Sequence, residues 1–490
     1  MSNSGEKHSI TGNIALSTMY QILTMVIPLI TAPYVSRALG PTGIGIYSYT
    51  QSYSMYFSLF AALGTVSYGT REIARHRNNR KELSQIFWEI VTLTIIVSAV
   101  CIVLWGIWIL FNERYRYYYL VLTVSLLGTM VDISWLYAGL EEFKYTVLQN
   151  SIFKILGAVA IFVFVKDEGD LGVYLLILSL TTFLANFSMW LYLPKFVSPV
   201  NIRGIRIAKH FRETLVYFVP TIATSIYTIL DKTLIGLITD DARENGYYEQ
   251  ATKIVNMAKT LSFAGVNMVL QSRISYLFAE DRIDEIKERI SVSMDYILFM
   301  GSGLCFGLIG VASRFVPLFF GQGYEKTIIL LQMLAPVTII IGISNCLGSQ
   351  FYNPAGLRAQ SAKYIICGSV VNLVLNIILI PKLGSLGAVI ATIIAEATIS
   401  GLYLFNCRGF YLARTLLTQI WKKIAAGIVM CLVVIYIGSI IDNGLLAVIL
   451  LVAIGGTVYC LLLLIGRDSF VSVFIVSFIK KVFKRREING

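Results

Sequence analysis

One apolar stretch of the chain carries an acid and a base side by side where a lipid bilayer would surround them. Residues 215–238 read LVYFVPTIATSIYTILDKTLIGLI, long enough to cross a membrane as a helix, and include Asp231 and Lys232. Further polar residues recur every three or four positions and so share one side of that helix: Thr221, Thr224, Ser225 and Thr228. Ionisable side chains at this depth cost a few kcal/mol or more and face a bundle interior or a wet cavity. The stretch therefore predicts a helix that lines a polar pathway, with a purely structural Asp231–Lys232 pair as the alternative.

The composition fits a chain made mostly of such helices. Hydrophobic residues make up 56% of the 490 residues and charged residues 14%, so we expect an all-α polytopic membrane protein. The seven cysteines are scattered through apolar segments without a CxxC pair, so we expect no disulfide framework, no metal and no cofactor. The sequence lacks GxxxxGK[ST], HExxH and any other recognisable catalytic constellation. We therefore expect no enzymatic activity and no catalytic residue.

A helix-length window finds about fourteen candidate spans. They cover residues 12–35, 43–65, 86–111, 117–139, 146–165, 172–193, 214–238, 248–272, 290–312, 326–352, 361–381, 385–405, 421–441 and 444–466. With a cytoplasmic amino terminus, about 26 loop Lys and Arg residues fall inside and about 8 outside, which is the positive-inside bias. We therefore expect a multi-pass protein of the cytoplasmic membrane with both termini in the cytoplasm. The net charge of +12 then reflects topology, and we expect no nucleic-acid partner.

The two halves of the chain resemble each other. At one constant offset Tyr137, Gly169 and Gly172 fall on Tyr352, Gly384 and Gly387, and at another Gly45 and Tyr47 fall on Gly246 and Tyr248. Parallel repeats of this kind place a substrate cavity between two lobes. We expect a six-helix lobe at residues 1–195, a basic cytoplasmic linker at 196–213 and a second six-helix lobe at 214–406. Two further helices and a basic amphipathic tail on the inner leaflet would occupy residues 407–490.

Four segments carry a family resemblance: SRALGPTGIGIYSYTQSY from Ser36, LGTVSYGTREIARHR from Leu63, WLYAGLEE from Trp135, and LDKTLIG from Leu230 with GYYEQATKI from Gly246. In order and spacing they resemble the Wzx-type oligosaccharide flippases. These form the polysaccharide transporter branch of the multidrug/oligosaccharidyl-lipid/polysaccharide exporter superfamily. The resemblance covers residues 10–405 and departs at LQSRIS from Leu270, where many relatives have a proline that kinks the helix.

The resemblance implies a transporter that flips undecaprenyl-diphosphate-linked oligosaccharides by alternating access, for O-antigen, capsule or exopolysaccharide synthesis. Its partners would be that glycan lipid, membrane lipid, a glycan polymerase and other polysaccharide assembly proteins. A lipid II flippase and a multidrug or metabolite antiporter of the same superfamily are the near alternatives. A glycan polymerase or ligase usually needs a large external loop, and the external loops predicted here are short. A structural platform for glycan enzymes is the remaining alternative.

A carrier of such a lipid needs cations for the diphosphate and hydrogen-bonding groups for the sugar. The candidate diphosphate ligands are the basic residues Lys232, Lys154, Arg37, Arg273 and Lys253. The candidate sugar-facing residues are Tyr20, Gln21, Tyr47, Gln51 and Asn150. Four acids at membrane depth are candidates for proton or sodium coupling or for a gate: Asp231, Asp132, Asp295 and Glu396. The alternative is that lysines near helix ends snorkel to the interface and that small polar residues serve only helix packing.

Overall fold

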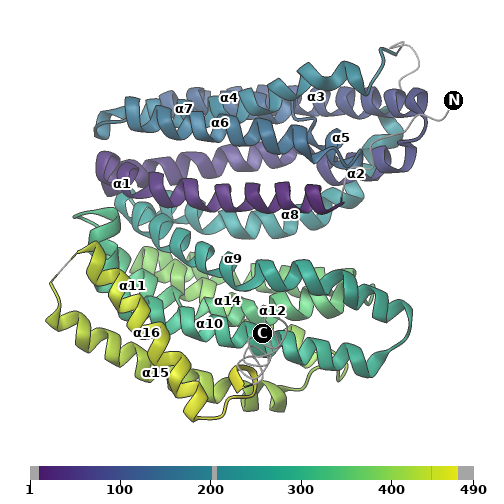
Figure 1. The fold of residues 1–490 in the computed structure, drawn as a ribbon. Coiled ribbons are helices and arrows are strands. Elements are labelled where there is room, and N and C mark those ends of the chain that lie inside the picture. Colours follow the sequence, from purple (N-terminus) through teal and green to yellow (C-terminus); the bar gives the residue numbers. More distant parts are fainter. Residues whose placement is uncertain (1–9, 201–206, 443, 473–490) are drawn as a thin grey trace, which may run out of the picture. The chain divides into compact units, whose positions relative to one another are not determined.

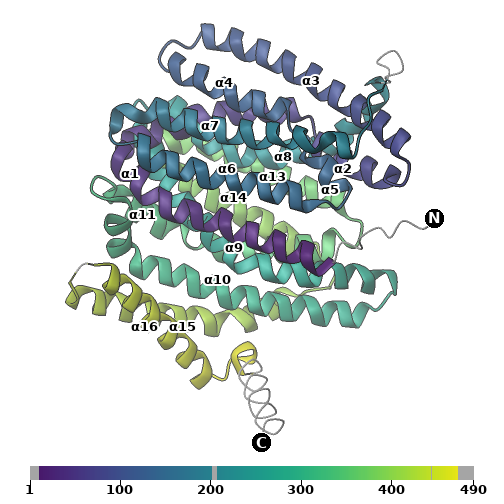
Figure 2. The ribbon, with the colours of Figure 1, turned by 45° about the horizontal axis from the view of Figure 1, so that its top comes forward.

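The computed structural model describes residues 10–200, 207–442 and 444–472, and within them the chain forms helices and no strand. It divides into two compact units after Gly246. Figures 1 and 2 show the helices from two directions. The predicted all-α polytopic fold is confirmed.

The first unit contains α1 to α8 with two short 3₁₀ turns. These elements are α1 (Ile10–Ala62), α2 (Thr65–His76), α3 (Arg80–Leu110), α4 (Arg116–Met130), α5 (Ser134–Gly139), α6 (Phe143–Phe164), η1 (Glu168–Asp170), α7 (Leu171–Ser188), η2 (Met189–Lys195) and α8 (Ile207–Ile238). Because α8 packs on α1, α2 and α3, the compact units divide at a different place from the predicted lobes, and the lobe division stays a prediction.

The second unit starts within α9 and contains the remaining helices. These elements are α9 (Ala242–Ala279), α10 (Ile283–Phe320), α11 (Glu325–Leu334), α12 (Val337–Leu347), the π-helical turn η4 (Gly348–Tyr352), α13 (Arg358–Leu383), α14 (Ser385–Phe405), α15 (Ala413–Ile440) and α16 (Leu445–Ile465). Both views place α15 beside α10 and α16, so the last two long helices pack on this unit. The predicted amphipathic tail after residue 472 lies outside the described residues.

Helix α1 is two membrane crossings joined at Gly40. Its 53 residues would extend about 80 Å as one rod, far more than the roughly 30 Å of a bilayer core. Gly40 breaks the helix with a φ of 61°, a value that glycine adopts without the steric cost of a side chain. The predicted spans 12–35 and 43–65 therefore correspond to its two halves.

The remaining predicted spans also fall on helices. The described residues hold 11 helices long and apolar enough to cross a membrane, and one of these, Met19–His76, comprises α1 from Met19 onward together with α2. Helices α8 and α9 are 32 and 38 residues long and cover the predicted spans 214–238 and 248–272. Helix α9 is continuous through the LQSRIS segment, where relatives have a proline.

The equivalent tyrosines Tyr137 and Tyr352 make similar hydrogen bonds. The Tyr137 hydroxyl donates to the Met189 carbonyl at 2.5 Å, and the Tyr352 hydroxyl donates to the Tyr403 carbonyl at 3.0 Å. The carbonyls of the same two tyrosines each accept a backbone N–H from five residues onward, both at 2.8 Å. Sequence similarity between the halves thus corresponds to similar local structure.

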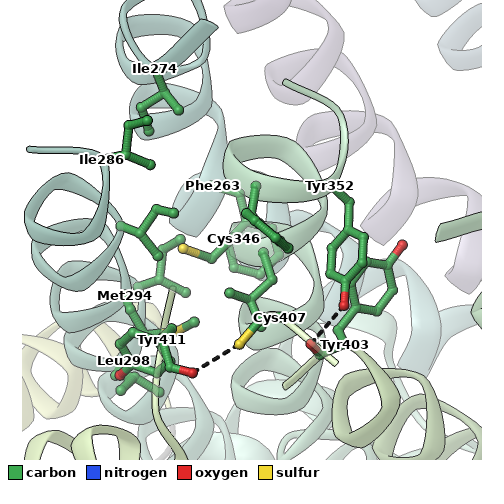
Figure 3. Packing of buried hydrophobic residues seen from close by; sticks show 14 of the residues in the cluster. Phe263, Ile274, Ile286, Met294, Leu298, Cys346, Tyr352, Tyr403, Cys407 and Tyr411 are labelled. Atoms are coloured by element: carbon green, nitrogen blue, oxygen red, sulfur yellow. Dashed lines mark hydrogen bonds between the residues drawn. The ribbon is translucent and has the colours of Figure 1, made fainter. Parts of the chain in front are cut away.

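Each unit has apolar interior clusters and an apolar exterior. In the second unit, Met294, Cys346, Tyr352, Tyr403 and Tyr411 belong to one buried cluster (Figure 3). Large apolar side chains on outward faces stay exposed, for example Val103, Val159, Val370 and Leu446. A surface of this kind suits contact with lipid tails rather than water.

Candidate functional site

Asp231, the acid on the predicted polar side of residues 215–238, lies where α8 packs on α1. Asp231 is buried with 6% of its surface exposed, and its charge lies close enough to Tyr56 to interact with it. Two residues further on, the Thr233 hydroxyl donates to the Ser52 hydroxyl at 2.9 Å. Of the predicted polar side, Asp231 is buried, Ser225 is half-buried and Thr228 is exposed. The side chains of Thr221 and Thr224 lie outside the described part of the chain.

Lys232 is half-buried, and its backbone carbonyl accepts a hydrogen bond at 2.8 Å from the side-chain amide of Asn245. This bond ties the end of α8 to the start of α9. Asp231 and Lys232 both take part in further interactions, so the structure is compatible with a gate and with a structural pair.

Two helix starts cross at glycines within the first unit, and we call Pro41–Gly45 and Ala242–Gly246 the glycine crossing. A Cβ on Gly45 would lie 1.8 Å from the Ala242 carbonyl oxygen, and a Cβ on Gly246 would lie 2.1 Å from the Pro41 carbonyl oxygen. Both positions therefore require glycine. Gly45 and Gly246 are equivalent in the predicted repeat, and reciprocal contacts between equivalent residues are those expected at a two-fold axis.

Lys154 on α6 meets Tyr20 on α1, which joins a predicted diphosphate ligand to a predicted sugar ligand. The Lys154 ammonium lies 4.9 Å from the centre of the Tyr20 ring, within the range of a cation–π interaction. Asn150 lies one helical turn before Lys154 and is half-buried. The structure thus brings Lys154 and Tyr20 together, and their role in substrate binding stays a prediction.

The other candidates of the first unit have less specific surroundings. Arg37 and Gln21 are exposed, and Gln51 is half-buried. The Tyr47 ring packs edge-on against Tyr174 at 5.3 Å, inside an apolar cluster around α1, α4 and α7. Tyr47 is therefore part of helix packing here rather than of the Lys154–Tyr20 contact.

In the second unit, the candidates lie on α9 and α14. Lys253 is half-buried, and Glu396 is buried near Lys259, so that their charges interact. Arg273 lies towards the end of α9, 3.6 Å from Glu285 and 5.4 Å from the centre of the Tyr276 ring. Glu285, whose side chain is 16% exposed, also binds two further arginines, Arg282 and Arg289. The role of Arg273 in substrate binding stays a prediction.

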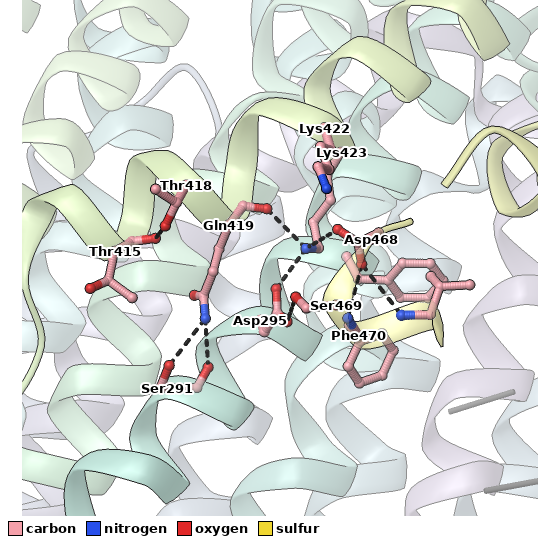
Figure 4. Close-up of polar contacts among 12 residues, drawn as sticks. Ser291, Asp295, Thr415, Thr418, Gln419, Lys422, Lys423, Asp468, Ser469 and Phe470 are labelled. Atoms are coloured by element: carbon pink, nitrogen blue, oxygen red, sulfur yellow. Dashed lines mark hydrogen bonds and ion pairs between the residues drawn. The ribbon is translucent and has the colours of Figure 1, made fainter. Parts of the chain in front are cut away.

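Asp295 belongs to a buried ion cluster that joins α10, α15 and the segment after α16, which we call the Lys423 cluster (Figure 4). The fully buried Lys423 ammonium contacts Asp295 at 2.6 Å and Asp468 at 2.9 Å. The Ser469 hydroxyl donates to Asp295, and the N–H groups of Phe470 and Val471 reach Asp468. The arrangement has a clear structural role, and its involvement in ion coupling stays a prediction.

Asp132 lies two residues before the short helix α5. Its carboxylate accepts the backbone N–H of Ser134 at 2.8 Å, in the break between α4 and α5. This bond satisfies an N–H group that the start of α5 leaves without a helical partner. The structure thus gives Asp132 a local role, and a coupling role stays a prediction.

Sequence reasoning missed a buried network of Tyr68, Glu89 and His210. These side chains come from α2, α3 and α8, and His210 bonds to both of the others. No spacing pattern joins residues so far apart in the chain; the one available signal was the rarity of histidine, which occurs three times in the sequence. The described residues contain no group of His, Cys, Asp and Glu that could hold a metal ion.

The fold and these sites define a multi-helix membrane protein with charged groups inside its helix bundles. Residues 10–278 match the family described as "Polysaccharide biosynthesis protein", and the chain belongs to this family. The predicted resemblance is thereby confirmed.

Two related proteins and one solved structure are similar to this chain. The "Putative O-antigen transporter" of Escherichia coli (strain K12) is 22% identical over 407 residues, which cover 82% of this chain and 97% of that protein. The "Probable low-salt glycan biosynthesis flippase Agl15" of Haloferax volcanii is 25% identical over 181 residues, 36% of this chain and 37% of that protein. The structure titled "Lipid II flippase MurJ, inward closed conformation" shares the fold with a TM-score of 0.74 and 16% identity, covering 93% of this chain and 99% of that one.

Proposed function

We propose that the chain flips undecaprenyl-diphosphate-linked oligosaccharides from the inner to the outer leaflet of the cytoplasmic membrane, for synthesis of a cell-surface polysaccharide. Membership of the polysaccharide biosynthesis family and similarity to an O-antigen transporter and a glycan flippase support this function. The observation on this chain that carries the proposal is the Lys154–Tyr20 contact. A cation and an aromatic ring held together between membrane helices provide a charge for a phosphate and a flat surface for a sugar.

In this proposal the cations bind the diphosphate and the polar residues of α1 and α6 bind the sugar. Lys154 and Lys232 are the principal diphosphate ligands, since an ammonium binds phosphate oxygens as a point charge. The glycine crossing supports alternating access, because helices that meet through small residues approach closely without interlocked side chains. With both termini cytoplasmic, the crossing lies on the outer side, where it separates to release the substrate.

Among the four acids, Asp231 is the proposed gate. It is buried beside a cation in the same helix, and that helix packs on α1, which carries Tyr20. Glu396 is the second candidate, because it is also buried and lies near a lysine. Asp132 and Asp295 rank below them, since the contacts described above already use both carboxylates locally.

The function is tested in cells that make the corresponding polysaccharide. Deleting the gene is expected to accumulate lipid-linked oligosaccharide on the inner leaflet, and the native chain restores export. Lys154→Ala and Lys232→Ala are expected to restore it poorly, whereas the control Lys382→Ala at the exposed end of α13 restores it fully. Rescue of cells that lack lipid II transport would instead support a lipid II flippase. Export of organic cations without any change in glycan lipid would support the drug-antiporter alternative.

A further inference from the structure

Three buried side chains of the first unit form a chain of hydrogen bonds, which we call the His210 network. The His210 Nδ1 atom lies 2.7 Å from the Tyr68 hydroxyl, and its Nε2 atom lies 2.6 Å from a carboxylate oxygen of Glu89. The exposed fractions of these residues are 0% for Tyr68, 5% for Glu89 and 2% for His210. The Gln85 amide donates to the other carboxylate oxygen of Glu89 at 3.1 Å.

The geometry allows two protonation states of the imidazole with different hydrogen bonding. A neutral ring satisfies both contacts in one way, with Nε2–H donating to Glu89 and Nδ1 accepting the Tyr68 O–H. A protonated ring donates from both nitrogens, so the Tyr68 hydroxyl must turn and accept. The added proton also turns a buried carboxylate beside a neutral ring into a His⁺–Glu⁻ pair with no net charge. One proton therefore switches both the direction of a buried hydrogen bond and the local charge.

The network fixes the start of α8. His210 is the fourth residue of that helix and follows the basic segment predicted to be cytoplasmic, while Tyr68 and Glu89 belong to α2 and α3. Further along, α8 carries Asp231, the proposed gate. A change in the hydrogen bonds that fix the first turn of α8 therefore acts on the helix that carries the proposed gate.

We propose that the His210 network is a proton-binding site that links cytoplasmic pH to the position of α8 during transport. This inference rests on the proposed function for its role in transport, but proton binding itself does not. It places the proton at the cytoplasmic end of α8 rather than at an aspartate of the membrane interior.

Other charged groups face the network and belong in any test. On α2 these are Arg71 and Glu72, and on α8 they are Glu213 and Tyr217. Glu72, Glu213 and Tyr217 each act electrostatically on Tyr68. Arg71 donates to the Tyr217 hydroxyl, and Glu72 pairs with Arg75 at 3.1 Å. On α3 the charged group is Glu89 itself.

The first experiment measures the proton directly. The chain has three histidines, His8, His76 and His210, so ¹⁵N-histidine NMR of the purified protein is simple, and His210→Gln assigns the resonance. The spectra are recorded from about pH 8 down to about pH 5, and we expect the His210 signal to change from that of the Nε2–H tautomer to that of the doubly protonated ring on acidification. Glu89→Gln is expected to move the midpoint to lower pH, and further than Glu72→Gln or Glu213→Gln. A single protonation state throughout this range would overturn the proposal.

The second experiment measures transport in liposomes at an internal pH of about 6 and about 8. The control is His76→Gln, because the native His76 ring bonds only to the Glu72 carbonyl among the described residues. In both the native chain and this control, the flipping rate is expected to differ several-fold between the two pH values. His210→Gln is expected to flip at a rate independent of pH. A native pH profile in His210→Gln would refute the coupling. Absence of flipping in the native chain, with the NMR titration intact, would refute the proposed function and leave the proton site standing.

Discussion

Replacing Lys423 with methionine should destabilise the second unit strongly. Lys423 is fully buried between two carboxylates that are themselves 9% and 3% exposed, so Lys423→Met leaves two buried charges without their cation. Removing one partner of a buried ion pair costs about 3–5 kcal/mol. At about 1.4 kcal/mol per factor of ten, local opening becomes roughly a hundred to a few thousand times more frequent.

Thiol labelling can measure this opening in detergent micelles. Cys431 lies two turns along α15 from Lys423 and is buried, whereas Cys367 and Cys460 are exposed and serve as internal references. We expect Lys423→Met to accelerate labelling of Cys431 by roughly a hundred-fold to a few thousand-fold. The half-buried Lys422, which donates to the Arg467 carbonyl, provides the control Lys422→Met with little expected effect.

A combined variant tests the electrostatic origin of the effect. Lys423→Met together with Asp295→Asn and Asp468→Asn removes all three charges and keeps oxygen acceptors for Ser469, Phe470 and Val471. Neutral replacements of a buried ion cluster are often tolerated, so slow labelling should largely return. Equal labelling rates in the native chain and the Lys423→Met variant would refute this reasoning.

Three further predictions concern the proposed transport path. Tyr20→Leu removes the cation–π contact, worth about 0.5–2 kcal/mol, so flipping in liposomes should slow several-fold while Tyr20→Phe stays near native; equal rates for the two would argue against the contact. Gly45→Ala should lower stability by about 1–3 kcal/mol in thermal unfolding, whereas the control Gly106→Ala, with nothing within 4 Å of its new Cβ, should not; similar unfolding of both would contradict the close crossing. Asp231→Asn keeps the shape of the side chain but removes the charge of the proposed gate, so flipping should fall about tenfold or more, and native rates would remove Asp231 as a gate.

Much of the fold was predictable because membrane helices leave a simple signal. A bilayer requires long apolar segments, so the predicted spans 86–111 and 385–405 correspond closely to α3 and α14. The sequence overlay singled out Gly45 and Gly246, and the structure shows that close backbone approach leaves no room for a side chain at either position.

The partners of charged residues were harder to predict. The sequence places Asp295 at membrane depth but does not reveal that Lys423 and Asp468 meet it, because those contacts join segments far apart in the chain. The same limit hid the His210 network. Lys154 and Tyr20 were each predicted by residue type and depth, while their mutual contact required the packing of α1 on α6.

The most direct test of the central claim is reconstitution of the purified chain in liposomes with labelled undecaprenyl-diphosphate oligosaccharide under imposed ion gradients. The account predicts that substrate protected in the inner leaflet becomes accessible outside with the native chain, and does so far more slowly with Lys154→Ala and Lys232→Ala. If no glycan lipid moves under any gradient while organic cations are transported, the chain is a drug exporter and the account is wrong.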